Sequence, residues 1–238
     1  MLKKIVAFLL ALLLVASLVA CEEPENPTPD TPSNPNEGLD NPAPSLVKSG
    51  GIEGCALTFE LYKDGTLYIK GTGEMAEMES NSSTSTRTPW HDYIANESST
   101  TIKKLIVEDG VTSISEGAFQ GCINLETAQI TTGVTVLPYK CFDRCTLLRT
   151  VRAKGVTQIH SDAFSGCARL TTVTVSAALQ LVEDGAFLAA GTQGTALAVR
   201  LAGNAEEWTA AQATEDFYLG QGNDVFLAAL EQLSFVSK

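Results

Sequence analysis

Hydrophobic positions in the central part of the chain recur with a period of 22 or 23 residues. An aliphatic residue stands five positions before each of four phenylalanines, another stands eight positions before, and a cysteine follows three positions after the first three. A chain with this period forms coils that each have one apolar side, which a single coil cannot bury and a neighbouring coil covers. The pattern predicts a stack of coils with an inward column of Phe119, Phe142, Phe164 and Phe187, and it places Phe187 near the end of the array.

Each repeat also contains a six-residue segment whose first, fourth and sixth positions are apolar, at 102–107, 125–130, 148–153 and 170–175. Because side chains alternate between the two faces of a strand, these segments predict a parallel sheet along one side of the coils. A glycine precedes the next aliphatic pair at Gly110, Gly133 and Gly155. At such a sharp corner we expect a positive φ, which glycine adopts without steric cost.

Two phrases resemble the BspA-type, or Treponema pallidum-type, leucine-rich repeat of bacterial surface proteins: GVTSI at 110–114 followed by GAFQGC at 117–122, and GVTQI at 155–159 followed by DAFSGC at 162–167. Residues 64–73 with Pro89 and Trp90, and residues 201–208 further on, resemble the terminal units of the same family. The resemblance implies a leucine-rich-repeat solenoid of mainly short parallel β-strands with turns and short helical segments. It implies repeats at 101–190 between a β-rich N-terminal capping unit at 51–100 and a mixed C-terminal capping unit at 191–238, since an open solenoid end exposes apolar surface.

The first 20 residues have the layout of a secretory signal peptide, with Lys3 and Lys4 ahead of an apolar run that ends in small residues. The residues before Cys21 read Leu-Val-Ala, and this junction resembles the lipobox of bacterial lipoproteins, in which the cysteine is acylated after the signal is cut. We therefore expect residues 1–20 to be removed and Cys21 to carry the lipid. The protein then attaches to the membrane through this anchor alone.

Residues 21–50 hold seven of the nine prolines among polar and acidic residues. Such a segment buries too little apolar surface to fold, and proline favours extended conformations, so we expect a disordered stalk. The acidic residues directly after Cys21 resemble the surface-export signals of Bacteroidetes lipoproteins. They imply a lipid-anchored protein exposed on the outer membrane of a bacterium of that group.

The net charge is −12, and removal of residues 1–20 leaves 14 basic residues against 28 acidic ones, a charge of −14. A strongly acidic protein is repelled by polyanions, which argues against nucleic acid and anionic lipid as the main partner.

The histidines and cysteines, which could in principle carry chemistry, are better explained by structural roles. There are two histidines and no serine elbow near them, so a Ser-His-Asp triad has no support. Cys122, Cys145 and Cys167 share one column of the repeat, where an unpaired cysteine packs as a small hydrophobic residue, although a secreted protein can also form disulfides. Cys141 and Cys145 lack a second ligand pair at zinc spacing. We expect no enzyme activity, no cofactor and no metal.

The outward positions of the predicted sheet form the candidate binding surface. Five basic residues fall there, with Glu126 as the one acid among them. One interpretation is a charge ladder of Lys103, Glu126 and Arg149 across strands about 4.8 Å apart, which stabilises the sheet modestly. The other is a ligand-binding surface, and the two are compatible. The candidate binding residues are Lys103, Lys104, Thr127, Gln129, Arg149, Arg152, Thr172, Thr174 and Arg200.

The resemblance implies a cell-surface recognition or adhesion module that binds a protein or another host-surface ligand through the repeat face. This step from fold to function rests on analogy. The alternatives are a glycan-binding accessory lipoprotein, which exposed aromatic residues on the face would favour, a structural spacer of the envelope, and a hydrolase, which needs titratable groups clustered in a cleft.

Replacement of the anchor tests the lipoprotein assignment. Because the thioether to the lipid needs the Cys21 thiol, Cys21→Ser should abolish labelling with a fatty-acid analogue and release the protein from membranes. The measurement is metabolic labelling followed by membrane fractionation. Labelling that persists in Cys21→Ser would contradict the assignment.

Overall fold

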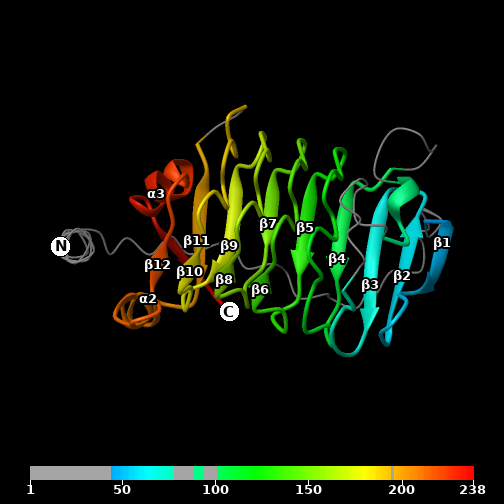
Figure 1. Cartoon of the computed structure of the whole chain (residues 1–238), viewed down its shortest axis with the longest axis horizontal. Helices are drawn as coiled ribbons and strands as arrows, with labels where there is room; N and C mark the ends of the chain where they lie inside the picture. The colour runs from blue at the N-terminus through cyan, green and yellow to red at the C-terminus, as the bar shows by residue number, and fades with distance from the viewer. Residues whose placement is uncertain (1–43, 78–87, 94–100, 194–195) are drawn as a thin grey trace, which may run out of the picture. The chain divides into compact units, whose positions relative to one another are not determined.

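The computed structural model describes residues 44–77, 88–93, 101–193 and 196–238 (Figure 1). The expected signal peptide, the anchor residue Cys21 and most of the expected stalk lie outside these residues. The part from Pro44 to Lys238 forms one compact unit.

One long sheet of nine strands runs through this unit, in the order β1-β2-β3-β4-β5-β7-β9-β11-β13. The β1–β2 and β2–β3 pairs are antiparallel, and every later pair in the sheet is parallel. The expected solenoid with a parallel sheet of short strands is confirmed. The strands are β1 (Leu46–Gly51), β2 (Leu57–Tyr62), β3 (Thr66–Gly71), β4 (Lys104–Val107), β5 (Thr127–Ile130), β7 (Thr150–Arg152), β9 (Thr172–Ser176), β11 (Ala198–Ala202) and β13 (Ser234–Val236).

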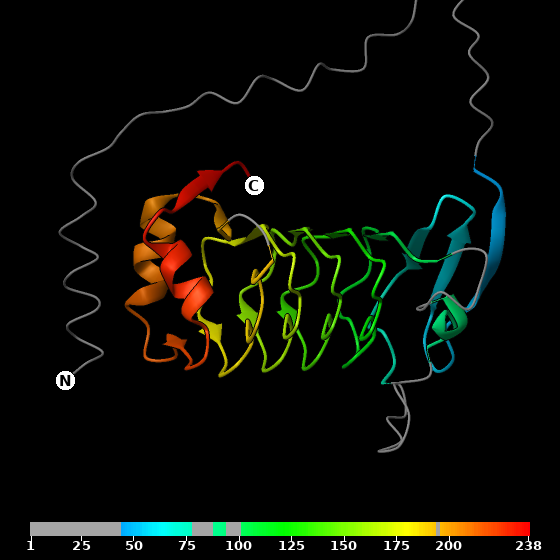
Figure 2. The same cartoon turned by 90° about the horizontal axis from the view of Figure 1, so that it is seen from above.

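A second sheet, which the sequence analysis did not anticipate, joins the coils at another side. Its four strands are parallel and follow the order β12-β10-β8-β6. Each strand has two residues, and the second is the aliphatic residue five positions before a phenylalanine in β6, β8 and β10. The strands are β6 (Val136–Leu137), β8 (Gln158–Ile159), β10 (Leu181–Val182) and β12 (Tyr218–Leu219). Figure 2 shows the successive coils side by side.

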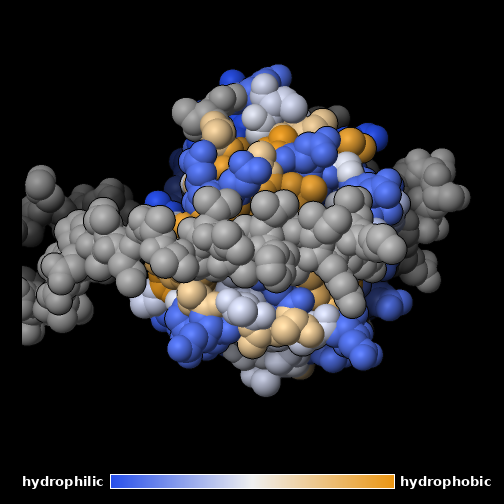
Figure 3. All heavy atoms as spheres, turned by 90° about the vertical axis from the view of Figure 1, so that its left-hand side faces the viewer, coloured by the Kyte–Doolittle hydropathy of each residue, from blue (hydrophilic) through white to orange (hydrophobic). Residues whose placement is uncertain are grey.

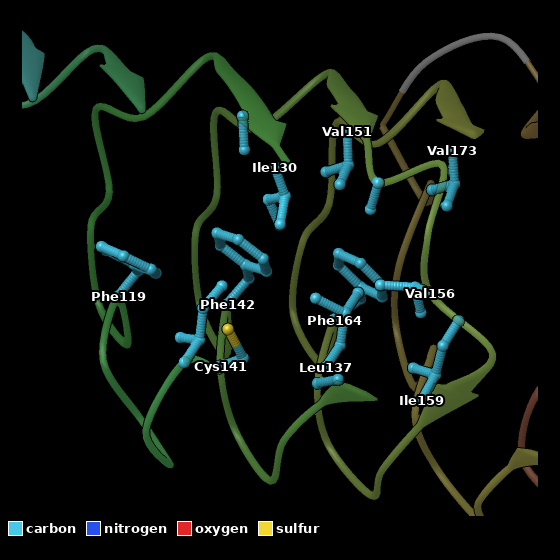
Figure 4. Close-up of a cluster of buried hydrophobic side chains, with 14 of the residues drawn as sticks. Phe119, Ile130, Leu137, Cys141, Phe142, Val151, Val156, Ile159, Phe164 and Val173 are labelled. Atoms are coloured by element: carbon cyan, nitrogen blue, oxygen red, sulfur yellow. The ribbon is translucent and has the colours of Figure 1, made fainter. Parts of the chain in front are cut away.

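The predicted phenylalanine column forms the centre of the core. Neighbouring rings stack with centroids 5.5 Å apart for Phe119 and Phe142, 5.7 Å for Phe142 and Phe164, and 4.9 Å for Phe164 and Phe187. All four side chains are at most 1% exposed. In Figure 4 the rings of Phe119, Phe142 and Phe164 lie between the aliphatic side chains of the two sheets. A stacked pair of rings contributes beyond the apolar area that it buries.

The column is longer than the sequence predicts, because an aromatic ring from each flank continues it. Trp90 stacks on Phe119 at 5.6 Å, and its Nε1 donates a hydrogen bond to the Ala118 carbonyl at 3.1 Å. Phe226 stacks on Phe187 at 4.6 Å. Phe187 is the last phenylalanine of the periodic repeats, but its ring does not end the column. Trp90 lies next to the short 3-10 helix η1 (His91–Tyr93), and Phe226 lies in helix α3 (Asp224–Leu230).

The C-terminal end is attached to the last coil by a buried asparagine. Asn223 is fully buried, its Oδ1 accepts a hydrogen bond from the Phe187 N–H, and its Nδ2 donates to the carbonyls of Glu183 and Gly220. Helix α2 (Ala205–Gln212) begins after Asn204, whose side chain caps the Glu207 N–H. Figure 3 looks onto this end, where hydrophilic surface alternates with apolar patches.

Every coil turns through left-handed backbone at two positions that flank its phenylalanine. The residue two positions before the ring has a φ of +61° at Gly117, +70° at Gly185, +55° at Lys140 and +58° at Asp162. Two positions after the ring, φ is +58° at Arg144 and +56° at Ala189. Residues other than glycine reach this region at a cost of roughly 1–2 kcal/mol. The turn geometry is therefore kept even where the sequence lacks glycine.

The expectation of a positive φ at the three corner glycines holds at Gly110, where φ is +101°, but not at Gly133 and Gly155. At these two positions glycine is needed because there is no room for a side chain. A Cβ on Gly133 would stand 2.8 Å from the Val111 carbonyl oxygen, and a Cβ on Gly155 would overlap the carbonyl oxygen of Thr132.

The cysteine column packs inside the coils. The thiols of Cys145 and Cys167 donate to the carbonyls of Phe119 and Phe142, each at 3.1 Å. Burial raises the pKa of the Cys141 and Cys145 thiols. The five cysteines in the described part of the chain are free thiols, and four of them are fully buried.

All but the last residue of strand β1 falls in the segment expected to be the stalk at 21–50. Residues 46–51 contain no proline and pair with β2 over most of their length. Because proline cannot donate to a sheet, the strand begins only after Pro42 and Pro44. The folded part therefore starts before the expected boundary at residue 51.

Truncation of the rings tests the column. Phe142→Ala removes a ring that is stacked on both sides and should lower the free energy of unfolding by about 3–5 kcal/mol. Phe226→Ala should cost less, because its ring ends the column. Chemical denaturation measures both changes. A loss below about 1 kcal/mol at Phe142 would mean that the column does not hold the coils together.

Candidate functional site

The candidate site is the outer face of the long sheet, defined here as the side chains of β2 to β11 that point away from the core. Strand register places them in columns that cross the strands, with neighbours about 4.8 Å apart. One column consists of Tyr68, Ile106, Gln129, Arg152, Thr174 and Arg200. The next consists of Thr66, Lys104, Thr127, Thr150, Thr172 and Ala198.

Most of the residues proposed from the sequence are accessible on this face. The exposed ones are Lys103, Lys104, Thr127, Gln129, Arg149 and Arg152, while Thr172 and Arg200 are half-buried. Thr174 is only 5% exposed, so its assignment as a binding residue is corrected. Its partners in register are Arg152 and Arg200, and two long side chains beside one short threonine leave little of it accessible.

The proposed charge ladder is present in register but not as direct ion pairs. The Glu126 N–H donates to the Lys103 carbonyl at 2.7 Å and the Arg149 N–H to the Glu126 carbonyl at 2.8 Å, so the three residues follow one another in adjacent coils. Among the described residues, no ion pair within 4.0 Å joins Lys103, Glu126 and Arg149. The positive charges of Lys103 and Arg149 are therefore not neutralised by a direct ion pair with Glu126.

Two tyrosines on the same face were missed by the sequence analysis. Tyr62 of β2 and Tyr68 of β3 are half-buried, with ring centroids 5.6 Å apart and an angle of 79° between the rings. Tyr68 pairs in register with Ile106 of β4, so the face continues from the repeats onto the N-terminal strands. Two alternations could have revealed them: Leu57, Phe59 and Leu61 against Thr58, Glu60 and Tyr62, and Leu67 and Ile69 against Tyr68.

An ionic network holds the two tyrosines. Lys70 Nζ lies 2.8 Å from a Glu60 oxygen, 3.7 Å from a Glu108 oxygen and 5.0 Å from the Tyr68 ring centroid. The Tyr62 hydroxyl donates to Glu60 at 2.8 Å. The hydrogen bond from Lys70, followed by that from Tyr62, lowers the pKa of the Glu60 carboxyl, and the bond to Glu60 raises the pKa of Lys70.

One more lysine on the repeats was missed. Lys154 follows Arg152 by two residues, the spacing of one strand face. Its Nζ donates to the Ser237 carbonyl at 2.7 Å. This lysine therefore binds the C-terminal end of the chain.

Other titratable groups with shifted pKa values are not gathered at one place. The Tyr218 hydroxyl, with the Gln221 N–H second, lowers the pKa of Asp184 at the C-terminal end, while the shifted thiols lie in the core. In residues 44–77, 88–93, 101–193 and 196–238, no group of three or more His, Cys, Asp or Glu side chains is placed to hold a metal ion. Over the same residues, no helix has the length and apolar composition to cross a membrane.

Removal of Lys70 tests the network around the tyrosines. In Lys70→Met the pKa of Glu60 should rise towards its ordinary value, though not fully, because Tyr62 still donates to it. Because the folded pKa lies below the unfolded one, the network stabilises the fold above the unfolded pKa, and this contribution is lost as pH falls through the folded pKa. NMR titration of the Glu60 carboxyl measures the shift, with Lys63→Met in the β2–β3 turn as control. An unchanged Glu60 pKa in Lys70→Met would contradict the network.

The sequence and the fold were compared with known proteins. A model described as the BspA type leucine rich repeat region matches residues 94–193 in six copies. A leucine-rich repeat protein from Eubacterium ventriosum is similar at 17% identity and a TM-score of 0.48, covering 68% of this chain and 45% of that one. A leucine rich cell surface protein from Faecalibacterium prausnitzii is similar at 15% identity and a TM-score of 0.20, covering 67% of this chain and 71% of that one.

The chain spans under half the length of the Eubacterium ventriosum structure. No curated protein matches the sequence significantly. The matched residues include the four stacked phenylalanines and the parallel strands β4 to β10. Residues 94–193 of this chain are therefore a region of BspA-type leucine-rich repeats.

Proposed function

We propose that this protein is a surface recognition or adhesion module that binds a polypeptide partner through the outer face of its long sheet. The observation that carries the proposal is the charge of this face. Lys103, Lys104, Arg149 and Arg152 are exposed there, and in the described part of the chain none of them forms an ion pair within 4.0 Å. The whole chain, by contrast, has a net charge of −12.

This contrast favours an acidic partner that docks in one orientation. The rest of an acidic protein repels such a partner, while the local positive charge attracts it, so electrostatics sets the orientation and the rate of encounter more than the affinity. Solenoids present long regular surfaces of this kind to their ligands. Exposed Thr127 and Gln129, with the half-buried Thr150 and Thr172, add hydrogen-bond donors and acceptors.

The location of the protein belongs to the same proposal. The signal-like residues 1–20 and the lipobox-like junction at Cys21 support lipid anchoring, and the acidic residues that follow support export to the surface of a Bacteroidetes outer membrane. The proline-rich segment then holds the folded unit away from the membrane, because polyproline spacers extend about 3.1 Å per residue.

Glycan binding is the second candidate, and Tyr62 with Tyr68 is the observation that favours it. Their rings stand at 79° to each other, edge to face, so they do not form one flat platform for a sugar chain. The polypeptide partner therefore remains the preferred one.

Charge reversal on the face tests the proposed function. Arg149→Glu combined with Arg152→Glu should slow association with an acidic partner recovered on the immobilised protein by roughly tenfold or more, and should flatten its salt dependence. Folding should change by at most about 1 kcal/mol, because exposed charges contribute little to stability. The measurement is the association rate at two salt concentrations.

The matched control changes the same charge elsewhere. Lys140→Glu combined with Arg144→Glu alters the turns that flank Phe142, where the Arg144 side chain is 77% exposed. This control should associate like the wild type. Equal association rates for the Arg149 and Arg152 variant and the wild type would remove the face from the account.

A further inference from the structure

We propose that the N-terminal strands supply an apolar anchor site for the polypeptide partner. Tyr62, Tyr68 and Ile106 form this anchor site, which takes an aromatic or branched aliphatic side chain of a partner segment whose acidic residues lie against Lys104, Arg149 and Arg152. The inference rests on the proposed function and adds to it the chemistry and spacing of the partner. It also assigns a binding role to strands that otherwise serve to cap the solenoid.

Continuity of the sheet places the anchor site and the basic residues on one surface. Strand β3 pairs with β4 over four residues in parallel register, which puts Tyr68 directly beside Ile106 and Thr66 beside Lys104. Leu67 and Ile69 of the same strand are fully buried, so Tyr68 between them points outward. A partner that lies across the repeats therefore meets the tyrosines on the same sheet.

The two rings are fixed before any partner binds. The Tyr62 hydroxyl is held by Glu60, and the Tyr68 ring packs against Tyr62 and under the Lys70 ammonium group. A side chain that is already ordered loses little conformational entropy on binding, so its contacts contribute more to affinity. Tyrosine is also among the residues that most often dominate the energy of protein interfaces.

The charges around the anchor site suit an apolar group beside an acidic one. Glu60 and Glu108 are both paired with Lys70, which reduces their repulsion of an acidic partner. On the other side of Ile106, the exposed side chains of Lys103 and Lys104 begin the positive row. The face thus passes within one strand from an apolar part, where one lysine partly offsets two glutamates, to a positively charged part.

Strand spacing sets the separation of the two groups in the partner. Tyr68 and Arg152 belong to one column and are three strands apart, which is about 14 Å. An extended segment covers this distance in about four residues at roughly 3.3 Å each, and a helix needs about nine at 1.5 Å each. The partner segment therefore carries an apolar residue with acidic residues at one of these two spacings.

Synthetic peptides of defined sequence test the anchor site directly. The first peptide, of about 12 residues, carries one phenylalanine and a run of aspartates centred about four residues away, the extended spacing. A second peptide has serine in place of the phenylalanine, and a third has asparagines in place of the aspartates. A fourth peptide places the aspartates about nine residues from the phenylalanine in a helix-forming sequence, and a fifth is its serine counterpart. Fluorescence anisotropy with the purified protein measures the affinity for each.

The wild-type protein should bind the first or the fourth peptide about tenfold or more tightly than its serine counterpart, because an interface anchor of this kind is commonly worth that much. Tyr68→Ala should abolish this preference and leave binding of the serine peptide unchanged. Tyr68→Phe should keep the preference, since the ring carries the contact. Tyr139→Ala, at a tyrosine that is 39% exposed on a turn outside the face, should bind like the wild type.

A second variant distinguishes loss of the ring contact from misfolding as the cause of a lost preference. Tyr68→Thr retains a residue that suits a strand and removes the ring, so it should fold with the unfolding temperature of Tyr68→Phe and bind like Tyr68→Ala. If Tyr68→Thr folds normally and still prefers the phenylalanine peptide, the anchor site is overturned.

The outcomes distinguish this inference from the proposed function. If the Arg149 and Arg152 reversal weakens binding of the aspartate peptides but Tyr68→Ala does not alter the preference, the anchor site is wrong and the charged face stands. If the reversal has no effect on the aspartate peptides, the proposed function itself fails. If no peptide binds while an oligosaccharide array gives binding that Tyr68→Ala removes, the tyrosines serve a glycan and the inference is overturned.

Discussion

The stacking of one aromatic ring on the next is the interaction on which the rest of this structure depends. No coil can bury its own apolar side, so each needs a neighbour that returns to the same place. The rings of Phe119, Phe142, Phe164 and Phe187 meet this need at centroid distances of 4.9 to 5.7 Å. The left-handed turns on both sides of each ring and the thiols that donate to the turn carbonyls serve the same end, because they bring every ring back into the column.

Once the rings are in register, the strands are in register as well. The outward side chains of these strands then form the surface that a partner can meet. The inward positions of β4 to β9 are fixed as apolar, while the outward ones are free to vary because they contribute little to the core. This freedom is visible in one column, where Ile106, Gln129 and Arg152 occupy equivalent positions. A regular scaffold thus carries an irregular surface, and the chemistry of that surface determines what is bound.

The repeats could be predicted from the sequence because their hydrophobic positions recur at a constant spacing. The ends could not, since Trp90 stands 29 residues before Phe119 and Phe226 stands 39 residues after Phe187, outside the period of 22 or 23. The tyrosines of the face were missed for a related reason: β2 and β3 form an antiparallel hairpin with no repeat pattern, and only its pairing with β4 joins it to the sheet. The burial of Thr174 depends on the length of its two neighbours, which alternation along a strand does not reveal.

The central claim is that the outer face of the long sheet is where a partner binds, and chemical footprinting of lysines tests it most directly. The protein is acetylated with and without a partner recovered on the immobilised protein, and each lysine is read by mass spectrometry. The account predicts that Lys103 and Lys104 are protected in the complex while Lys140, on a turn beside Phe142, stays reactive. Protection of Lys140 with Lys103 and Lys104 still reactive would contradict it.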